Sequence, residues 1–413
     1  MATTAQTNAD LDQIGKILAK HGINDTTNDN KIVVDLKNVN GYRPGFVDSL
    51  SGDELPEHTR NRFAKYGIDL SKGYPERPEN IPHFLDEGYA IRNRANPDYV
   101  ERGRNADPSK KNLLGAAKEI REITPLIGTE VVGLQLGDLN EKQLDELALL
   151  VAERVVVVFR NQDLSPQKHL ELGKYYGEVE EHPLVAHVPG LRGATTVWGP
   201  FNRVGPLITY KKGLHQGWHT DLDHEFSPAA ITHLHLDSIP TTGGDTGFAS
   251  GYGAFDKLSQ PLQQFLEGKT AVHKSAHRYL NRDNVLGAPE HILREHPLVI
   301  THPVTGWKSL FVNRAHTVKI VGLEDSESQV ILNYLFDVYE KSLDIQTRVS
   351  WQPTKPGLGT SVIWDNRVSN HIAIPDYNDQ NGRLRHAVRV TSLGNVPNYD
   401  KNSKSQREAL FGA

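Results

Sequence analysis

The sequence predicts a mainly β fold with flanking helices, an α+β jelly roll, and three observations predict it. Strand-like apolar runs recur through the second half of the chain, and turn residues separate them. Two helical patterns, at 253–266 and 326–341, interrupt these runs. The run at 155–159 (VVVVF) has the length and the β-branched content of a buried strand. Short antiparallel strands with inserted helices are typical of a jelly roll whose helices pack outside the sheets.

The N-terminal region is expected to begin with a helix over residues 11–21, because Leu11, Ile14 and Leu18 fall on one helical stripe. From residue 24 to about residue 111 the chain is polar and rich in Pro, Gly, Asn and Arg, yet aromatic residues recur in it. A disordered segment is poorer in aromatic residues. Two interpretations stay open: an irregular arm that wraps the main body, with a role at a subunit interface, or a flexible leader.

Regular structure is expected from residue 113 onward. Asn140 can cap a helix over 140–154, and Ser165 followed by Pro166 can begin another over 165–176. Further strand material lies at 123–136, 230–236, 298–301, 309–312, 346–351 and 361–364. We therefore expect three parts: an N-terminal extension with short helices (1–112), the jelly-roll domain (113–396) and a C-terminal tail (397–413).

Composition excludes several classes of protein. Among 413 residues, 37% are hydrophobic and 23% charged, which is typical of a globular protein. The net charge is -5 and no basic block occurs, so a nucleic-acid partner is not expected. The absence of cysteine excludes disulfides, thiolate metal sites and a cysteine nucleophile. No apolar stretch has the length of a membrane span or a signal sequence, so we expect a cytoplasmic protein with no membrane partner.

Three residues have the composition of a non-heme Fe(II) site: His219, Asp221 and His371. Two imidazoles and one carboxylate can hold one face of an octahedral ion and leave the other face open. In an extended segment, the i, i+2 spacing of His219 and Asp221 places both side chains on one face. The distant histidine must then come from another strand. A His-x-Asp pair alone is more often a surface or hydrogen-bonded pair than a metal site, so the neighbouring motifs decide.

Those neighbouring motifs point to a dicarboxylate that binds beside the metal. The sequence Gly-Gly-Asp-Thr at 243–246 follows one strand-like segment. Three arginines, Arg383, Arg385 and Arg389, follow His371. A guanidinium offers a planar, permanently charged fork to a carboxylate.

At these motifs the chain resembles the TauD/TfdA family of Fe(II)- and 2-oxoglutarate-dependent dioxygenases, and in particular its fungal sulfonate-dioxygenase-like members. The resemblance runs from about residue 120 to 394, with several blocks in the same order: 152–162, 218–221, 243–246, 311–314 and 364–371. It implies a double-stranded β-helix, a cupin-like barrel with the iron at its mouth. It also implies an enzyme that uses Fe(II), 2-oxoglutarate and O2 to oxidise a C–H bond, with release of succinate and CO2.

The resemblance also implies residue roles. His219, Asp221 and His371 would bind iron, Thr246 and Arg385 would bind 2-oxoglutarate, and the substrate anion would meet Arg389 and His182. His215 and His316 stand where taurine dioxygenases have an asparagine and a phenylalanine, and Ser275 aligns loosely with a second phenylalanine. The pocket is therefore expected to be more polar than that for taurine, and to accept a small anionic substrate such as an α-amino acid or another sulfonate.

Several alternatives stay open. Within the family, the chain could be a taurine or alkylsulfonate dioxygenase of sulfur assimilation, or a biosynthetic tailoring oxidase that cyclises or desaturates an amino acid. Outside the family, it could be a zinc hydrolase with the same three ligands, or a barrel that binds a small acid without turnover. Thr246 and Arg385 favour the oxygenase, since neither outside alternative needs a 2-oxoglutarate clamp. A homo-oligomer, a dimer or tetramer, is also expected.

Other residues receive structural interpretations. His233 and His235 share the i, i+2 spacing but lack a carboxylate at that spacing, so we expect them to be structural or at the sheet surface. Asp223 extends the face of His219 and Asp221 and could compete as a ligand, although its neighbour His224 suggests a turn. Arg367 is expected to hold the loop before His371.

Overall fold

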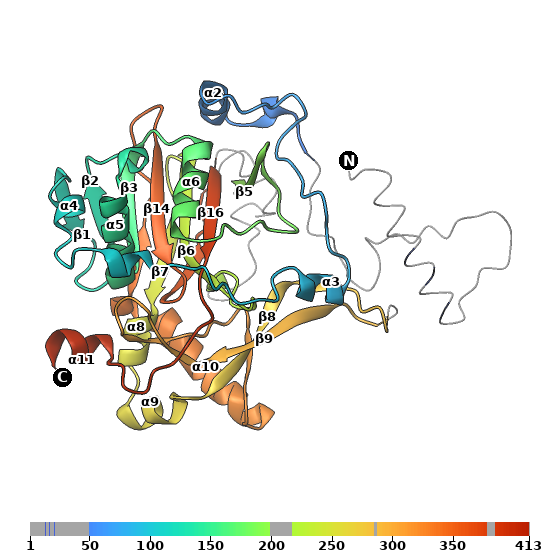
Figure 1. Ribbon diagram of the computed structural model, residues 1–413, viewed down its shortest axis with the longest axis vertical. Coiled ribbons are helices and arrows are strands. Elements are labelled where there is room, and N and C mark those ends of the chain that lie inside the picture. The colour runs from blue at the N-terminus through green and yellow to red at the C-terminus, as the bar shows by residue number, and fades with distance from the viewer. Residues whose placement is uncertain are drawn as a thin grey trace.

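The computed structural model describes residues 49–198, 217–284, 287–377 and 385–412, together with Gln13, Lys16 and Lys20. Two facing β-sheets form its centre (Figure 1). The larger sheet has the strand order β1-β2-β3-β14-β6-β16-β5-β4 and the smaller one has the order β13-β7-β15. Two further sheets, β12-β8-β9 and β10-β11, lie outside this pair.

The strands have the following bounds: β1 (Glu119–Glu122), β2 (Thr129–Val132), β3 (Val156–Gln162), β4 (His187–Val188), β5 (Leu191–Trp198), β6 (Ala229–Ser238), β7 (Thr246–Ser250), β8 (Thr270–Tyr279), β9 (Glu290–Pro297), β10 (Val299–Thr301), β11 (Lys308–Leu310), β12 (Thr317–Ile320), β13 (Gln346–Val349), β14 (Gly359–Asp365), β15 (Ser369–Ala373) and β16 (His386–Leu393). The α-helices are α2 (Glu57–Lys65), α3 (Leu85–Ala90), α4 (Lys111–Leu114), α5 (Glu141–Arg154), α6 (Pro166–Tyr176), α8 (Gly251–Asp256), α9 (Gln260–Leu266), α10 (Asp325–Lys341) and α11 (Gln406–Phe411).

The core between the two main sheets comes from their facing sides. Phe248 and Val349 of the smaller sheet pack in one cluster with Leu234, Val362 and Trp364 of the larger sheet. The larger sheet is antiparallel except where β2 pairs with β3. This arrangement confirms the expected mainly β jelly roll.

Helices α5 and α6 cover the outer face of the larger sheet (Figure 1). The Asn140 side chain accepts a hydrogen bond from the backbone N–H of Gln143, which caps α5. Ser165 caps α6 in the same way, and Pro166 is the first helical residue. Leu147 and other apolar residues of α5 pack on the outward side chains of β3. Both predicted helices and the predicted buried strand are confirmed.

Three other predicted helices have different outcomes. The predicted helix 253–266 is wrong as one element, because α8 ends at Asp256 and a second helix, α9, begins at Gln260 after its N-cap residue Ser259. Pro261 cannot donate a backbone hydrogen bond, so it favours a new helical start at this point. The helix predicted at 326–341 is confirmed as α10. The helix predicted at 11–21 lies almost wholly outside the described residues.

Residues 49–112 lie against the jelly roll at two places. Phe63 and Tyr74 pack in one buried cluster with Trp198 and residues of β16. Further along, Leu85 and its neighbours pack with Tyr279 and other residues near β8 and β9, and Figure 1 shows α3 beside these two strands. We call residues 49–112 the arm. The division of the chain into three parts stays a prediction.

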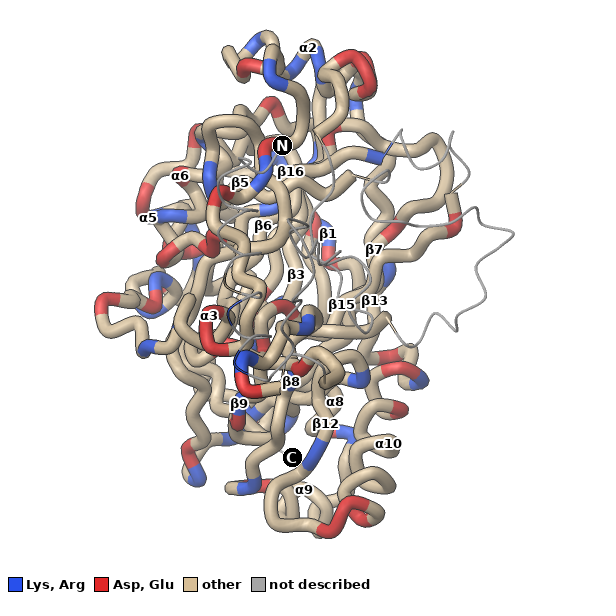
Figure 2. The backbone as a smooth tube through the Cα atoms, turned by 90° about the vertical axis from the view of Figure 1, so that its right-hand side faces the viewer, with Lys and Arg blue, Asp and Glu red and all other residues tan. Residues whose placement is uncertain are grey.

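The charged residues are interspersed along the described chain. Figure 2 shows Lys and Arg alternating with Asp and Glu over the side that faces the viewer, with no continuous basic stripe there. In the part of the chain that the structure describes, no helix is long and apolar enough to cross a membrane.

A group of buried histidines should make the fold sensitive to acid. His169 contacts His233 with ring centroids 4.0 Å apart, and His235 lies nearby in β6. Burial lowers the pKa of His169 to about 3 and the pKa values of His233 and His235 well below 6.5. Below pH 6.5 these histidines therefore bind protons in the unfolded chain but not in the folded chain. The free energy of unfolding should be highest, with respect to these groups, above pH 6.5 and should fall as the pH is lowered from there toward 3.

Urea unfolding at a series of pH values would measure this loss. His169→Gln should give a shallower dependence on pH between 6.5 and 5, since one of the three groups no longer titrates. A free energy of unfolding that is equal at pH 7 and pH 5 would contradict the expectation.

Candidate active site

His219 and His371 are joined through their backbones. The N–H of His219 donates to the carbonyl of His371 over 3.1 Å, and the N–H of His371 donates to the carbonyl of His219 over 2.7 Å. Asp221 follows two residues after His219. Side-chain ligand atoms of His219, Asp221 and His371 all lie within 4.8 Å of one another. The structure thus brings together the three residues that the sequence singled out.

The ring orientations of both histidines suit metal binding. Nδ1 of His219 lies 2.7 Å from the carbonyl oxygen of Gly217, and a carbonyl only accepts, so Nδ1 carries the proton. This leaves Nε2 with a lone pair, 3.6 Å from Oδ1 of Asp221. Nε2 of His371 lies 3.9 Å from the same oxygen. The His371 ring stacks on Phe248 at 27° with a centroid distance of 6.1 Å.

Asn366 forms hydrogen bonds that connect the segment of His219 and Asp221 with the segment that leads to His371. Its carbonyl oxygen accepts from the Thr220 hydroxyl over 2.6 Å, and its side-chain oxygen accepts from the Asp221 N–H and from Trp364 Nε1. Asn366 is 1% exposed. Hydrogen bonds of this kind fix the first ligands before a metal arrives.

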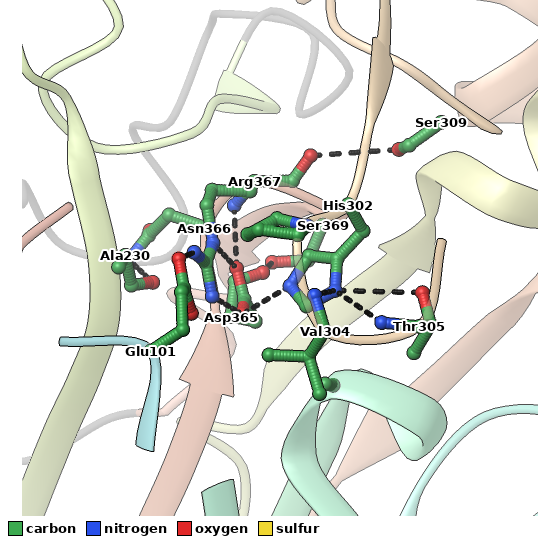
Figure 3. A network of polar contacts seen from close by, with 12 residues as sticks. Glu101, Ala230, His302, Val304, Thr305, Ser309, Asp365, Asn366, Arg367 and Ser369 are labelled. Carbon is green, nitrogen blue, oxygen red and sulfur yellow. Dashed lines mark hydrogen bonds and ion pairs between the residues drawn. The ribbon is translucent and has the colours of Figure 1, made fainter. Parts of the chain in front are cut away.

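A buried ion network holds the loop that leads to His371. Figure 3 shows Arg367 between Asp365 and Glu101, a residue of the arm. Nε of Arg367 donates to Oδ1 of Asp365 over 2.9 Å, and Nε2 of His302 lies 3.0 Å from Oδ2 of the same carboxylate. The side chains of Arg367 and Glu101 are each 8% exposed. This placement agrees with the expectation that Arg367 holds the loop before His371.

Arg389 lies against the carboxylate of Asp221. Its Nη1 is 3.2 Å from both oxygens of Asp221. Burial raises the pKa of Asp221, but the charge of Arg389 and the contact with His219 outweigh burial and hold that pKa well below its usual value. The carboxylate is therefore ionised and available to a cation.

The two residues expected to bind 2-oxoglutarate lie in one region. Nε of Arg385 donates to the carbonyl of Gly244 over 3.2 Å, two residues before Thr246. Arg385 is 5% exposed. The Thr246 hydroxyl is buried and has no hydrogen-bond partner among the described residues. A buried, unpartnered hydroxyl beside a buried guanidinium fits a carboxylate ligand.

A cavity of about 350 Å³ opens beside His219 and Asp221, two of the three clustered residues. His182, His316 and Arg389 line it together with His219 and Asp221. Ala276 and His277 line it where the alignment placed Ser275, whose buried hydroxyl donates to the His277 carbonyl instead. His215 and Arg383 lie outside the described residues, so their expected roles stay predictions.

Asp223 is not one of the clustered ligand residues. It is 0% exposed, and its carboxylate meets His273 at 3.0 Å, Asn313 at 2.6 Å and His316 at 2.9 Å. Asp223 therefore serves to orient His316 toward the cavity. The interpretation of Asp223 as a competing ligand was wrong, because the turn after Asp221 directs its side chain into the protein.

Several residues that line the cavity have no sequence signal. They are Gly88, Ile91, Arg92, Pro183, Val185, Leu222, His224, Glu225, Ala276, His277, Tyr279, Ile292 and Ala315. They come from the arm, from the loop before β4, from the turn after Asp221, from strands β8 and β9, and from the turn before β12. Only their packing in the folded chain brings them to one wall.

The donor set fits one divalent iron ion that keeps open positions. Two imidazole nitrogens and one carboxylate lie close together, and no thiolate is available in the sequence. A threonine at the start of β7 and an arginine that contacts the Gly244 carbonyl just before β7 are suited to a dicarboxylate. The fold and the site together define the class of non-heme Fe(II)- and 2-oxoglutarate-dependent oxygenases.

Comparison with known proteins agrees with this class. The family model "Taurine catabolism dioxygenase TauD, TfdA family" matches residues 119–391, and the chain belongs to this family. The alpha-ketoglutarate-dependent dioxygenase cnsM of Penicillium expansum is 36% identical over 350 residues, covering 78% of this chain and 90% of the relative. The alpha-ketoglutarate-dependent sulfonate dioxygenase of Saccharomyces cerevisiae is 36% identical over 324 residues, covering 73% and 74%.

Solved structures give the same result. A taurine dioxygenase from Burkholderia xenovorans superposes with a TM-score of 0.56 at 27% identity, covering 68% of this chain and 90% of that chain. The chain is thus a dioxygenase that depends on Fe(II), 2-oxoglutarate and O2, with the fold that the sequence predicted.

Proposed function

We propose that this enzyme oxidises a C–H bond of a small anionic substrate, an α-amino acid or a sulfonate, and releases succinate and CO2. In this proposal His219, Asp221 and His371 bind the iron, and Thr246 and Arg385 bind 2-oxoglutarate. The observation that carries it is that Arg389, a cation, lines the same cavity as the ligand residues. A substrate anion on Arg389 would present its carbon chain to the metal.

The protein's contribution is binding and orientation. Arg385 and Thr246 would fix the far carboxylate of the cosubstrate, and Arg389, His182 and His316 would face the prime substrate. When bound, Fe(II) with 2-oxoglutarate supplies the activation of O2 that oxidation requires. A misplacement of about 1 Å at the reacting carbon can cost about a hundredfold in rate, so these polar contacts decide which bond is oxidised.

A second candidate within the class is a taurine or alkylsulfonate dioxygenase of sulfur assimilation. The similarity to the yeast sulfonate dioxygenase supports it. His316 supports the first candidate instead, because it places a polar ring where taurine enzymes have an apolar one. Cyclisation or desaturation of an amino acid would use the same binding groups, and the product would distinguish these outcomes from hydroxylation.

The proposal is tested by measuring succinate release from 2-oxoglutarate with Fe(II) and ascorbate. The compounds would be sulfonates, sulfate esters, α-amino acids and aryloxy acids. At least one small acid should raise succinate release well above the rate without substrate, and taurine should not be the best of them. No stimulation by any acid would contradict the proposed substrate class.

Iron binding provides a separate prediction. Anaerobic addition of Fe(II) and 2-oxoglutarate should give a weak visible charge-transfer band, and His219→Ala or His371→Ala should abolish it because one nitrogen ligand is lost. His187→Ala is a suitable comparison, since His187 is also buried but is neither one of the clustered residues nor a residue that lines the cavity. A full band in His371→Ala would exclude that residue as a ligand.

The homo-oligomeric state, a dimer or tetramer, and the cytoplasmic location stay predictions of this proposal. Light scattering of the purified protein would measure the first. Fractionation of the source cells would measure the second.

A further inference from the structure

Two ion pairs face the cavity beside the ligand residues. Arg389 pairs with Asp221 at 3.2 Å, and Nη2 of Arg92 pairs with Oε1 of Glu225 at 2.6 Å. Among the described residues that line this cavity, these four are the only Asp, Glu, Lys and Arg side chains. The first pair adjoins the proposed iron site. The second pair has no role in the proposed function.

The arm places Arg92 at this wall. Helix α3 ends two residues before Arg92, and the N–H of Leu85 at its start donates to the carbonyl of Leu280 over 2.9 Å. Gly88 lets the helix approach closely, since a Cβ atom there would lie 3.0 Å from Ile292 and 3.1 Å from Tyr279. The position of Arg92 is therefore set by packing of the arm on β8 and β9.

The charge of Arg92 is already well compensated. Besides Glu225, the carboxylate of Glu180 lies 3.7 Å from Nη2, and Nη1 donates to the carbonyl of Glu181 over 3.2 Å. A second substrate anion at Arg92 would meet two carboxylates, and repulsion between like charges is strong where water is excluded. Arg92 is thus poorly suited to bind an anion.

Glu225 is better suited to bind a further charged group. Its side chain is 12% exposed and lines the cavity. The neighbouring His224 lies 3.6 Å from Oε1, but burial lowers the pKa of His224 to about 4, so this ring is neutral at pH 7. If a cation shares Glu225, Arg92 still has Glu180 beside it.

We propose that Glu225 binds an ammonium group of the substrate while Arg389 binds its anionic group, so that the substrate is a zwitterion: an amino acid or an aminosulfonate. This inference rests on the proposed function and narrows its substrate class. When Asp221 binds the metal, the guanidinium of Arg389 is available to the substrate anion. Each charged group at the cavity then has a partner of opposite charge. Arg92 is then a positioning residue that orients Glu225.

The test uses pairs of compounds that differ only in one amino group, such as an ω-aminoalkanesulfonate with the alkanesulfonate of equal length, and an amino acid with the matching carboxylic acid. The wild-type protein, loaded with Fe(II) and 2-oxoglutarate, should show a higher kcat/KM for the amino member, by about tenfold or more, because a hydrogen bond to a charged group is involved. Succinate release measures the rate.

Glu225→Gln keeps the shape of the side chain and removes its charge. This variant should raise KM for the amino member by about tenfold and leave KM for the other member unchanged. Glu130→Gln is a matched control, because Glu130 is also 12% exposed, pairs with an arginine at 3.0 Å and does not line this cavity. The Fe(II) charge-transfer band and the unfolding temperature should not differ between Glu225→Gln and Glu130→Gln.

Succinate release without preference for the amino member overturns this inference and leaves the proposed function standing. A preference that survives Glu225→Gln also overturns it. Absence of succinate release from every compound overturns the proposed function, and the inference with it. Loss of the preference in Glu225→Gln, but not in Glu130→Gln, supports the inference.

Discussion

Replacing Arg367 by alanine should lower the free energy of unfolding by about 3–5 kcal/mol, since it leaves buried carboxylates without their cation. Arg367 is 7% exposed and stands between Asp365, which is 1% exposed, and Glu101 of the arm. His302 remains near Asp365, but one imidazole cannot replace the several hydrogen bonds that the guanidinium donates to the two carboxylates. Urea unfolding at pH 7 would measure the loss.

The same variant should weaken the iron site, because the loop that Arg367 holds leads to His371 four residues later. Arg121→Ala is a suitable control: Arg121 also pairs with two glutamates, but its side chain is 53% exposed, and pairs of this kind contribute about 0–1 kcal/mol. Equal losses of stability in the two variants would show that burial of the Arg367 network has no special effect.

Arg385→Ala should raise the concentration of 2-oxoglutarate required for half-maximal activity by about a hundredfold to a thousandfold. Breaking one side of a buried ion pair costs about 3–5 kcal/mol, and each 1.4 kcal/mol is about tenfold in affinity. Fe(II) should still bind, since His219, Asp221 and His371 are unchanged. Steady-state rates at varied 2-oxoglutarate, together with anaerobic metal titration, separate the two effects.

Arg348→Ala serves as the comparison for this variant. Arg348 lies in the neighbouring strand β13 and pairs with Asp245 and Asp376, but its side chain is 53% exposed. Its loss should change the 2-oxoglutarate requirement by less than about fivefold. An unchanged requirement in Arg385→Ala would assign the cosubstrate carboxylate to another group, such as Arg383.

The cluster of His219, Asp221 and His371 could be predicted because its signal is local or belongs to a motif. His219 and Asp221 lie two residues apart on one strand-like segment, and the backbone pairing with His371 completes the set. The helices capped by Asn140 and Ser165 were predictable for the same reason, since caps act within one turn.

The far wall of the cavity could not be predicted from the sequence. Arg92 and Glu225 are 133 positions apart, and neither lies in a periodic pattern or a motif. Strands β8 and β9, which form a separate sheet with β12, were also missed, because charged residues and histidines break their apolar alternation. Only tertiary packing decides which polar side chains of such segments turn inward.

The arm and the jelly roll supply different parts of the site, and this has a consequence for the engineering and the evolution of the enzyme. The side chains proposed to bind the metal and the cosubstrate come from the jelly roll, whereas Gly88, Ile91 and Arg92 of the cavity wall come from the arm. Exchange of this stretch between relatives could redirect the oxidation to another compound without rebuilding the oxidising machinery. Substitutions in α3 and in the residues after it should therefore change which substrates are accepted and leave the metal site unchanged.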